Sequence, residues 1–480
     1  MTNKRTKIVC TIGPSCESVE TLTEMVRAGM NVARLNFSHG TYENHAMLIA
    51  NIRKVEEATG QPIAIMQDLQ GPKIRLGILP DEGVNLEEGK TIVFDTAQDT
   101  YTDGVIPIGY EGLHKHVKRG ERVLLSDGKI EVQVVSVEGT RIEATVVVAG
   151  TVFSHKGINV PDTALDIAVI TEKDKEDVKF GIEQQVDLMA LSFVIRPDDI
   201  IDLRYLIKEY EQQQGQQASQ PIRLIAKIER REAVEAIDDI LDVADGIMVA
   251  RGDLGIEIPA KDVPLVQKKL IDSALAKAKP VIVATQMLDS MQENPRPTRA
   301  EVSDVANAVI DHTDAVMLSN ETATGKYPVV TVSTMSAIIE ETEQSQYDDL
   351  VLRSYAQDQD DTDGVISEMS RLLAERVGAK FILAASLSGD SGRLISRHRP
   401  EISIMVATLD RRPMRQLSLS WGVMPFVLPE CRSIEELVER SISYLKEHDR
   451  AVTGDKLIVV AGEPVGQSGK MNLLEVREVP

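Results

Sequence analysis

The sequence predicts an α/β protein whose largest part is a (β/α)8 barrel, or TIM barrel. We expect a small β-barrel lid domain inserted in this barrel and a separate α/β domain at the C-terminus. Two observations predict this architecture. Eight times in residues 1–345 a short apolar run ends in polar or charged residues and is followed by a helix-like stretch. The alternation stops once, after the third run, for a long segment without helical periodicity.

The barrel elements are expected in strict alternation along the chain. The strands are expected at 6–13, 31–38, 62–68, 186–193, 222–229, 246–253, 280–287 and 315–319. The helices are expected at 17–30, 41–59, 172–185, 197–213, 230–243, 263–278, 298–310 and 327–343. A doubly wound sheet is the alternative, but it needs a switch point in its strand order and usually has fewer units.

Residues 71–166 consist of short β-branched runs separated by turn-forming residues, which is typical of an all-β domain. Because this segment interrupts a loop at the end of the barrel where active sites lie, we expect it to act as a lid. After an acidic stretch at 344–364, apolar runs alternate with helical segments, as in a layered α/β domain. The expected domains are the barrel (1–70 and 167–345), the β lid (71–166) and the C-terminal domain (346–480).

The composition argues against several classes of function. The net charge is −22 and aromatic residues make up only 4% of the 480 residues, so we expect no nucleic-acid partner. The same charge argues against an anionic membrane surface, and no apolar run reaches the roughly 18–20 residues of a membrane span. Cys10, Cys16 and Cys431 are too few and scattered for a zinc site, and they fit a reducing, cytoplasmic location.

A lysine and two carboxylates come at the ends of the fifth and sixth expected strands. Lys227 and Glu229 are two residues apart and so face the same side of one strand, while Asp253 closes the next. Two carboxylates suit Mg²⁺, which prefers oxygen ligands and keeps positions open for water and substrate. Alternatively, they cap strands or pair with Arg230 or Arg231. Lys227 favours the metal site, because a lysine facing the barrel axis is costly unless it neutralises an anion.

The residues after the sixth and seventh strands suggest a site for a substrate anion. In the turn expected there, the backbone amides of Arg251, Gly252 and Asp253 are arranged to hold a carboxylate or phosphate. Thr285 ends the seventh strand, where its hydroxyl can donate to a substrate or relay a proton. Each feature also has a plain structural explanation: GDLG (252–255) as an ordinary turn, and Thr285 as a cap.

A second polar group is expected at the ends of the second and third strands. Arg34, Asn36 and Ser38 alternate along one strand and face one way, and Asp68 ends its neighbour. This combination suits a phosphate together with a cation, and an ordinary Arg34–Asp68 salt bridge is the alternative. Further positive charge follows directly in GPKIR (71–75).

The segment SLSGDSG (386–392) has the hydroxyl and glycine content of a phosphate-binding loop, and it lies between an apolar run and a helix. A simple turn between strand and helix is the alternative. The chain has no Walker A motif, since GQSGKM (466–471) lacks both the first glycine and the hydroxyl residue that follows the lysine.

Together these segments resemble the pyruvate kinase family, across essentially the whole chain. The resemblance is carried by TKIVCTIGPS (6–15), ARLNFSHG (33–40), GPKIR (71–75), AKIE (226–229), MVARGDLGIEIP (248–259), ATQMLDSM (284–291), RPTRAEVSDVANAV (296–309) and MLSNETATGKYP (317–328). It implies transfer of a phosphoryl group from phosphoenolpyruvate to ADP in glycolysis, followed by protonation of the enolate to pyruvate. It also implies Mg²⁺ or Mn²⁺ as cofactor, a C-terminal domain for an effector and for assembly, and a homotetramer.

The resemblance further implies roles for the matching residues. Lys227 would stabilise the transferring phosphoryl group, Arg34 would bind phosphate, and Thr285 would lie beside the substrate near the path of the proton. The substrate-binding set comprises Arg34, Lys227, Ala250, Arg251, Gly252, Asp253 and Thr285, of which the amides at 251–253 would hold the carboxylate. The Mg²⁺ ligands would be Glu229 and Asp253. Nucleotide contacts are expected from Asn36, Phe37, Ser38, His39, Arg75 and Arg196. A phosphorylated effector is expected at Ser386, Ser388, Ser391 and Lys470.

The chain departs from the family pattern at three places. Potassium-dependent members are expected to hold the ion at the positions of Asn36, Ser38, Asp68 and Leu69, next to an acid at the position of Lys73. We therefore expect that the Lys73 ammonium lies close to Asp68 and that K⁺ is not required. Asn320 replaces a common glycine, without an expected effect on chemistry. Asp390 stands among the hydroxyls of the effector loop, where a carboxylate repels phosphate.

Two other functions are alternatives. A Mg²⁺-dependent aldolase or lyase that handles phosphoenolpyruvate or pyruvate would share the carboxylate pair, but it needs neither a lid nor nucleotide-binding arginines. A non-catalytic metabolite sensor would not need the complete set of Lys227, Glu229, Asp253 and Thr285.

Overall fold

The computed structural model describes residues 4–163, 165, 167–215, 220–351, 354–355, 361–462 and 471–480. Its centre is a closed barrel of eight parallel strands in the order β1-β16-β15-β14-β13-β12-β3-β2. The strands are β1 (Lys7–Thr11), β2 (Val32–Asn36), β3 (Ala64–Asp68), β12 (Leu188–Leu191), β13 (Arg223–Ile228), β14 (Gly246–Ala250), β15 (Val281–Ala284) and β16 (Ala315–Leu318). The predicted barrel is confirmed, and most strand residues are buried on both faces, as in other parallel barrels.

Helices separate consecutive strands. They are α1 (Val19–Ala28), α2 (Tyr42–Thr59), α3 (Glu172–Glu183), α4 (Pro197–Gln213), α5 (Arg231–Glu235), α6 (Ile237–Val243), α7 (Arg251–Glu257), α8 (Val263–Ala276), α9 (Arg299–Ile310), α10 (Asn320–Ala323) and α11 (Pro328–Glu343), with a 3₁₀ turn η2 (Asp289–Gln292). Hydroxyl side chains of Ser18, Thr41, Thr171 and Thr298 cap the N-termini of α1, α2, α3 and α9. Two expectations were wrong in detail. The single helix expected at 230–243 is two helices meeting at Ala236. Residues 251–253, expected as strand end and turn, begin α7.

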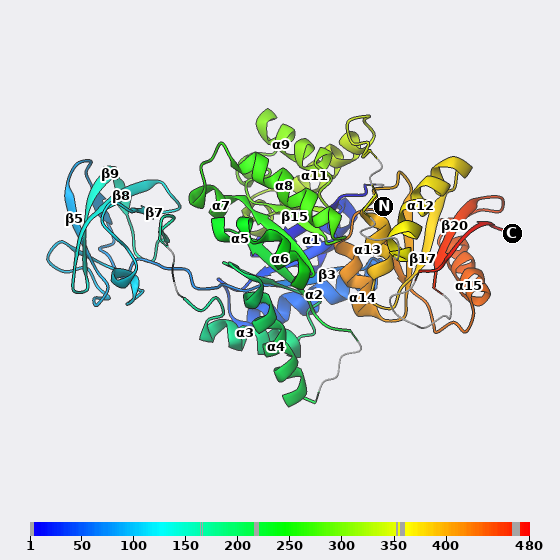
Figure 1. Ribbon diagram of the computed structural model, residues 1–480, viewed down its shortest axis with the longest axis horizontal. Coiled ribbons are helices and arrows are strands. Elements are labelled where there is room, and N and C mark those ends of the chain that lie inside the picture. The colour runs from blue at the N-terminus through cyan, green and yellow to red at the C-terminus, as the bar shows by residue number, and fades with distance from the viewer. Residues whose placement is uncertain are drawn as a thin grey trace.

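The inserted segment forms a β domain with its own apolar core. Its elements are β4 (Val84–Leu86), β5 (Thr91–Asp95), β6 (Val105–Pro107), η1 (Leu113–Lys115), β7 (Arg122–Leu125), β8 (Ile130–Glu138), β9 (Arg141–Val148), β10 (Gly150–Val152) and β11 (Ile158–Asn159). The strands form a curled six-stranded sheet, β11-β7-β8-β9-β5-β6, and a two-stranded sheet, β10-β4. In Figure 1 this domain projects from the barrel, on the side opposite to the C-terminal part of the chain.

The C-terminal part is a five-stranded sheet in the order β19-β18-β17-β20-β21. Its elements are α12 (Thr362–Val377), β17 (Phe381–Ala385), α13 (Asp390–Ser396), β18 (Ser403–Thr408), α14 (Arg411–Gln416), η3 (Leu417–Leu419), β19 (Val423–Val427), α15 (Ile434–Glu447), β20 (Lys456–Ala461) and β21 (Leu473–Glu478). Helix α15 packs in one apolar cluster and α12 and α13 pack in another, so the sheet is covered on both faces. The antiparallel edge strand β21 was not predicted.

The C-terminal domain packs against the N-terminal ends of the barrel strands. Lys7 Nζ at the start of β1 donates to the carbonyl oxygen of Val423 at 2.8 Å. Arg399 Nη2 lies 3.0 Å from Asp314 Oδ2, just before β16. The β insertion leaves the barrel after Asp68, at the opposite end. Among the described residues, no helix combines the length and apolar character needed to cross a bilayer.

Candidate active site

The barrel brings Lys227, Glu229, Asp68 and Arg34 together at the C-terminal ends of β13, β3 and β2. Lys227 Nζ lies 2.9 Å from Glu229 Oε1 and 3.2 Å from Asp68 Oδ1. Arg34 Nε lies 2.6 Å from the other oxygen of Asp68. The Arg34–Asp68 salt bridge, which was the alternative to a phosphate and cation site, therefore exists, but it is part of a group of two cations and two carboxylates rather than an isolated pair.

The charges in this group depend on one another. Burial lowers the pKa of the Lys227 ammonium, but Asp68 and Glu229 outweigh this and leave that pKa raised. Burial alone would raise the pKa of Asp68, yet Lys227 and Arg34 hold it below its usual value. Burial raises the pKa of Glu229, and Lys227 opposes this only in part. Lys227 is consequently a fixed positive charge inside the barrel mouth.

Three residues that sequence reasoning missed hold this group in place. Ser192 Oγ accepts a hydrogen bond from Lys227 Nζ at 2.7 Å and donates to the carbonyl oxygen of Leu69 at 2.7 Å. The amide of Phe193 donates to Glu229 at 2.7 Å. Thr11 Oγ1 accepts from Arg34 Nη1 at 2.9 Å. The only available signal was their position at the ends of apolar runs.

Helix α7 and the end of β15 form the next wall of the site. Thr285 Oγ1 accepts a hydrogen bond from the amide of Gly252 at 2.8 Å, in the first turn of α7. Thr285 has φ 73°, a conformation that a β-branched residue rarely adopts. Strained backbone of this kind clusters at functional sites, because the surrounding structure must hold it there. The strained backbone of Thr285 therefore supports a place for this residue in the active site.

The Arg251 side chain points away from a substrate position and serves the scaffold. Its two Nη atoms each lie 2.7 Å from a different oxygen of Asp304, and Nη2 also donates to the carbonyl oxygen of Thr285 at 2.8 Å. The Arg251 guanidinium is therefore not available to bind a substrate. Its backbone, like that of Ala250 and Gly252, remains part of the wall.

Asp253 faces the inserted β domain. Its Oδ1 lies 3.7 Å from Lys73 Nζ, and the same ammonium lies 3.8 Å from Asp127 of that domain. A further contact joins the two domains where Asn159 Nδ2 donates to Glu257 at 3.3 Å. Lys73 was expected beside Asp68 and is not found there. The cations that balance Asp68 are Arg34 and Lys227 instead.

The donor set fits a divalent cation that keeps water ligands. Among the described residues, no group of three or more His, Cys, Asp and Glu side chains could hold a metal ion. Mg²⁺ does not require one, because one or two carboxylates with water and substrate oxygens suffice. The negative charge of Asp253 raises the pKa of Glu229, and a bound cation would relieve this repulsion. Glu229 and Asp253 therefore fit Mg²⁺ or Mn²⁺.

The residues expected to bind a nucleotide lie around the barrel rim and differ in their exposure and contacts. Asn36 Oδ1 accepts from the amide of Ser38 at 3.2 Å. His39 is exposed, whereas the Phe37 ring is buried and stacks on His45 with ring centres 4.1 Å apart. The Phe37 side chain is therefore not available to a ligand. Two arginines lie apart from these residues: Arg75 donates to the carbonyl oxygen of His155, and Arg196 is an exposed side chain before α4.

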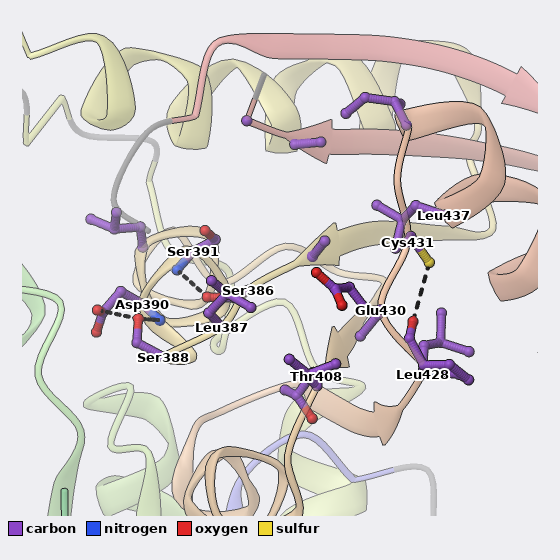
Figure 2. Close-up of a pocket in the computed structure, with 18 of the residues that line it drawn as sticks. Ser386, Leu387, Ser388, Asp390, Ser391, Thr408, Leu428, Glu430, Cys431 and Leu437 are labelled. Carbon is purple, nitrogen blue, oxygen red and sulfur yellow. Dashed lines mark hydrogen bonds between the residues drawn. The ribbon is translucent and has the colours of Figure 1, made fainter. Parts of the chain in front are cut away.

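The loop before α13 borders a cavity of about 240 Å³ in the C-terminal domain, shown in Figure 2. Ser386, Ser388 and Ser391 all line it, together with leucines and Glu430. Lys470 lies outside the described residues. Burial would raise the pKa of Asp390, but Arg393, Ser388 and Arg223 hold it well below its usual range. The carboxylate that sequence reasoning expected to repel phosphate is thus paired with two arginines.

Known proteins match this chain over nearly its whole length. Residues 3–332 match the family model described as pyruvate kinase, barrel domain, and residues 365–477 match pyruvate kinase, alpha/beta domain. The chain is 42% identical to a pyruvate kinase of Geobacillus stearothermophilus over 479 residues, which are 99% of this chain and 80% of the relative. It is 39% identical to a pyruvate kinase of Clostridium acetobutylicum, covering 99% of this chain and all of the relative. A crystal structure of a pyruvate kinase from Cryptosporidium parvum superposes with a TM-score of 0.92 at 37% identity, over 100% of this chain and 97% of the other.

Proposed function

The chain belongs to the pyruvate kinase family, and from this premise we propose how its residues transfer a phosphoryl group from phosphoenolpyruvate to ADP. The observation that supports the proposal best is the buried Lys227 ammonium, held between Asp68 and Glu229. A fixed positive charge in a dry site stabilises charge that develops in a transition state, because it needs no reorganisation during the reaction. We assign the phosphoryl group to Lys227 and Arg34.

We assign the binding of the phosphoenolpyruvate carboxylate to the backbone between Ala250 and Asp253. The methylene carbon of the substrate would then lie beside Thr285. The Thr285 hydroxyl already accepts from the Gly252 amide, so it is held in place before a substrate binds. Bound to Glu229 and Asp253, Mg²⁺ or Mn²⁺ would neutralise phosphate charge as a Lewis acid. Phosphoryl transfer depends mainly on positioning and charge neutralisation, and these residues supply both.

The adenosine diphosphate is assigned to the rim formed by Asn36, Ser38, His39 and Arg75, with Arg196 as an outer contact. For Phe37 we assign only a backbone role, because its ring packs on His45. The β domain (71–166) would close over this rim from its hinges on the barrel (1–70 and 167–345). A decisive experiment measures pyruvate formation from phosphoenolpyruvate with and without ADP. Pyruvate formation that requires ADP supports the phosphotransferase, whereas pyruvate formation without ADP would indicate transfer of the phosphoryl group to water. No pyruvate in either case would favour an aldolase, a lyase or a metabolite sensor.

We predict that the enzyme does not need potassium. Lys73 supplies a positive charge at the boundary between barrel and β domain, where it faces both Asp253 and Asp127. The expected potassium site at Asp68 lies elsewhere, and Arg34 and Lys227 already balance Asp68 there, so a further cation beside it would meet like-charge repulsion. Activity should be close to maximal in potassium-free buffer with tetramethylammonium as counterion. Tens-fold activation of the unmodified enzyme by KCl would contradict the prediction.

We predict a phosphorylated effector at the loop that carries Ser386, Ser388 and Ser391, with Lys470 as a further ligand. Pairing of Asp390 with Arg223 and Arg393 supports this, since it removes most of the repulsion that the carboxylate would exert. Sugar phosphates and nucleotide monophosphates should be screened for activation at low phosphoenolpyruvate. Ser388→Asp should abolish the response by adding a second, unpaired carboxylate, whereas Ser443→Asp on the exposed side of α15 should keep it. An unchanged response in Ser388→Asp would make the loop structural.

The remaining assignments concern assembly and location. An apolar groove between α9 and α11, lined by Val302, Ala306, Val329, Val330 and Ile338, is exposed on the barrel surface. We propose that a second copy of the chain covers it and that the C-terminal domain (346–480) contributes another contact, giving a homotetramer. Sedimentation velocity tests the stoichiometry, and Val330→Asp should shift it to smaller species. A cytoplasmic location is proposed from the reaction's substrates.

A further inference from the structure

A small cavity lies where α13 of the C-terminal domain meets the N-terminal end of the barrel. Its volume is about 10 Å³. Four of the residues that line it are cationic: Lys279, Arg393, Arg397 and Arg399. The only carboxylate among the lining residues is Asp314. A cavity of this size holds about one water-sized particle.

Several donors around this cavity have no partner. Arg397 Nη2, Arg399 Nε and Ser420 Oγ are buried, and within the described part of the chain none of them has a hydrogen-bond partner. Arg397 is 6% exposed, Arg399 2% and Ser420 1%. All three residues line the cavity. Buried polar atoms are nearly always hydrogen-bonded, so three orphaned donors around one cavity point to a missing acceptor.

The positive charges around the cavity also exceed the negative ones. Asp314 is paired with Arg399 at 3.0 Å, and Asp390 pairs with Arg393. Lys279 and Arg397 have no ion pair within the described residues. Burial lowers the pKa of the Lys279 ammonium and of the Arg397 guanidinium. Arg397 is a buried cation without an ion pair, and Lys279 beside it is half-buried and also lacks one, so the two favour a bound counter-ion.

We propose that this cavity binds a monatomic inorganic anion, with chloride as the natural candidate. A single negative charge would accept hydrogen bonds from the orphaned donors of Arg397 and Ser420 and balance Lys279. Phosphate and sulfate are excluded by size, because the cavity holds only one water-sized particle. A water molecule fits the volume, but it would leave the charge excess uncompensated.

The anion would join two domains. Lys279 and Pro280 lead directly into β15, the strand that ends just before Thr285 of the proposed active site. Arg393, Arg397 and Arg399 come from α13 and the turn after it. An ion that binds only the folded chain raises the free energy of unfolding. Above the dissociation constant, this gain grows with the logarithm of the ion concentration. The interface between barrel and C-terminal domain should therefore be stabilised by chloride.

The test compares thermal unfolding of the full chain in potassium chloride and potassium glutamate at equal ionic strength. Chloride should raise the midpoint by roughly 2 °C, and the rise should saturate. Lys279→Met should abolish the chloride response without lowering the midpoint in glutamate, since it removes a half-buried cation that has no ion pair among the described residues. Lys208→Met, the same substitution on the exposed face of α4, should retain the response. Equal midpoints in the two salts, or a full response in Lys279→Met, would overturn the proposal.

A second measurement does not depend on any variant. Crystals of the unmodified protein grown in bromide should show an anomalous peak between Lys279 and Arg397. A water molecule there, without anomalous signal at saturating bromide, would show that the cavity is only hydrated. Neither experiment measures catalysis, so their outcome tests the anion site independently of the proposed reaction.

Discussion

Lys227→Met should lower turnover by about 10²-fold or more while the barrel stays folded. The lysine ammonium contacts both Asp68 and Glu229, and we assign to it the charge that develops on the transferring phosphoryl group. Methionine has a similar length and fills the same space without charge. Most of the loss should fall on turnover rather than on the KM for phosphoenolpyruvate, because the interaction strengthens as the transition state forms.

Two controls separate this loss from unfolding. Removing Lys227 leaves Glu229 without its cation, and an uncompensated buried charge can cost about 3–5 kcal/mol of stability. Thermal unfolding must therefore show that the variant is folded at the assay temperature. Lys227→Arg, which keeps the charge and moves it, should recover part of the activity. Near-normal turnover in a folded Lys227→Met variant would remove Lys227 from the proposed catalytic group.

The barrel could be predicted because each of its parts has a local signal. Its strands are buried on both faces and read as continuous apolar runs. Its helices start at capping hydroxyls such as Thr41 and Thr298, directly before the periodic segments. Because strand ends converge in a barrel, Lys227, Glu229 and Asp68 could be placed together from their positions in the chain alone.

The errors arise where no local signal exists. Helix α7 follows β14 without any side-chain cap, so nothing marks its start, and Arg251 was placed at a strand end. Strand β21 is a half-exposed edge strand with charged residues and lacks the apolar run of its neighbours. The packing of the Phe37 ring could not be predicted either, because its stacking partner, His45, comes from the following helix.

Contacts between distant residues could not be predicted either. Arg251 pairs with Asp304 on α9, 53 residues further along the chain. Lys73 lies near Asp253 and Asp127, from two different domains. A lysine side chain is long enough to choose among several carboxylates, and only the three-dimensional arrangement decides which one it reaches. The sequence shows that position 73 carries a positive charge, but it does not show that this charge lies near Asp253 and Asp127 rather than Asp68.

Asp253→Asn should weaken activation by Mg²⁺ by about 10–100-fold while it changes the KM for ADP much less. Asp253 is one of the two carboxylates that fit the divalent cation, and its amide analogue keeps the size but loses the negative charge. The charge of Asp253 also raises the pKa of Glu229, so the substitution should relieve repulsion between the two and leave the fold intact. Titration of activity with Mg²⁺ at saturating ADP measures the effect.

Asp127→Asn is the matched control. Asp127 is the other carboxylate near Lys73, at 3.8 Å, and it belongs to the β domain rather than to the barrel. If Asp253 acts only as a partner of Lys73, the two substitutions should have similar effects, because each removes one of the two carboxylates near the same ammonium. If Asp253 holds the cation, only Asp253→Asn should shift the Mg²⁺ titration. An unchanged titration in that variant would leave Glu229 as the single protein carboxylate available to the metal.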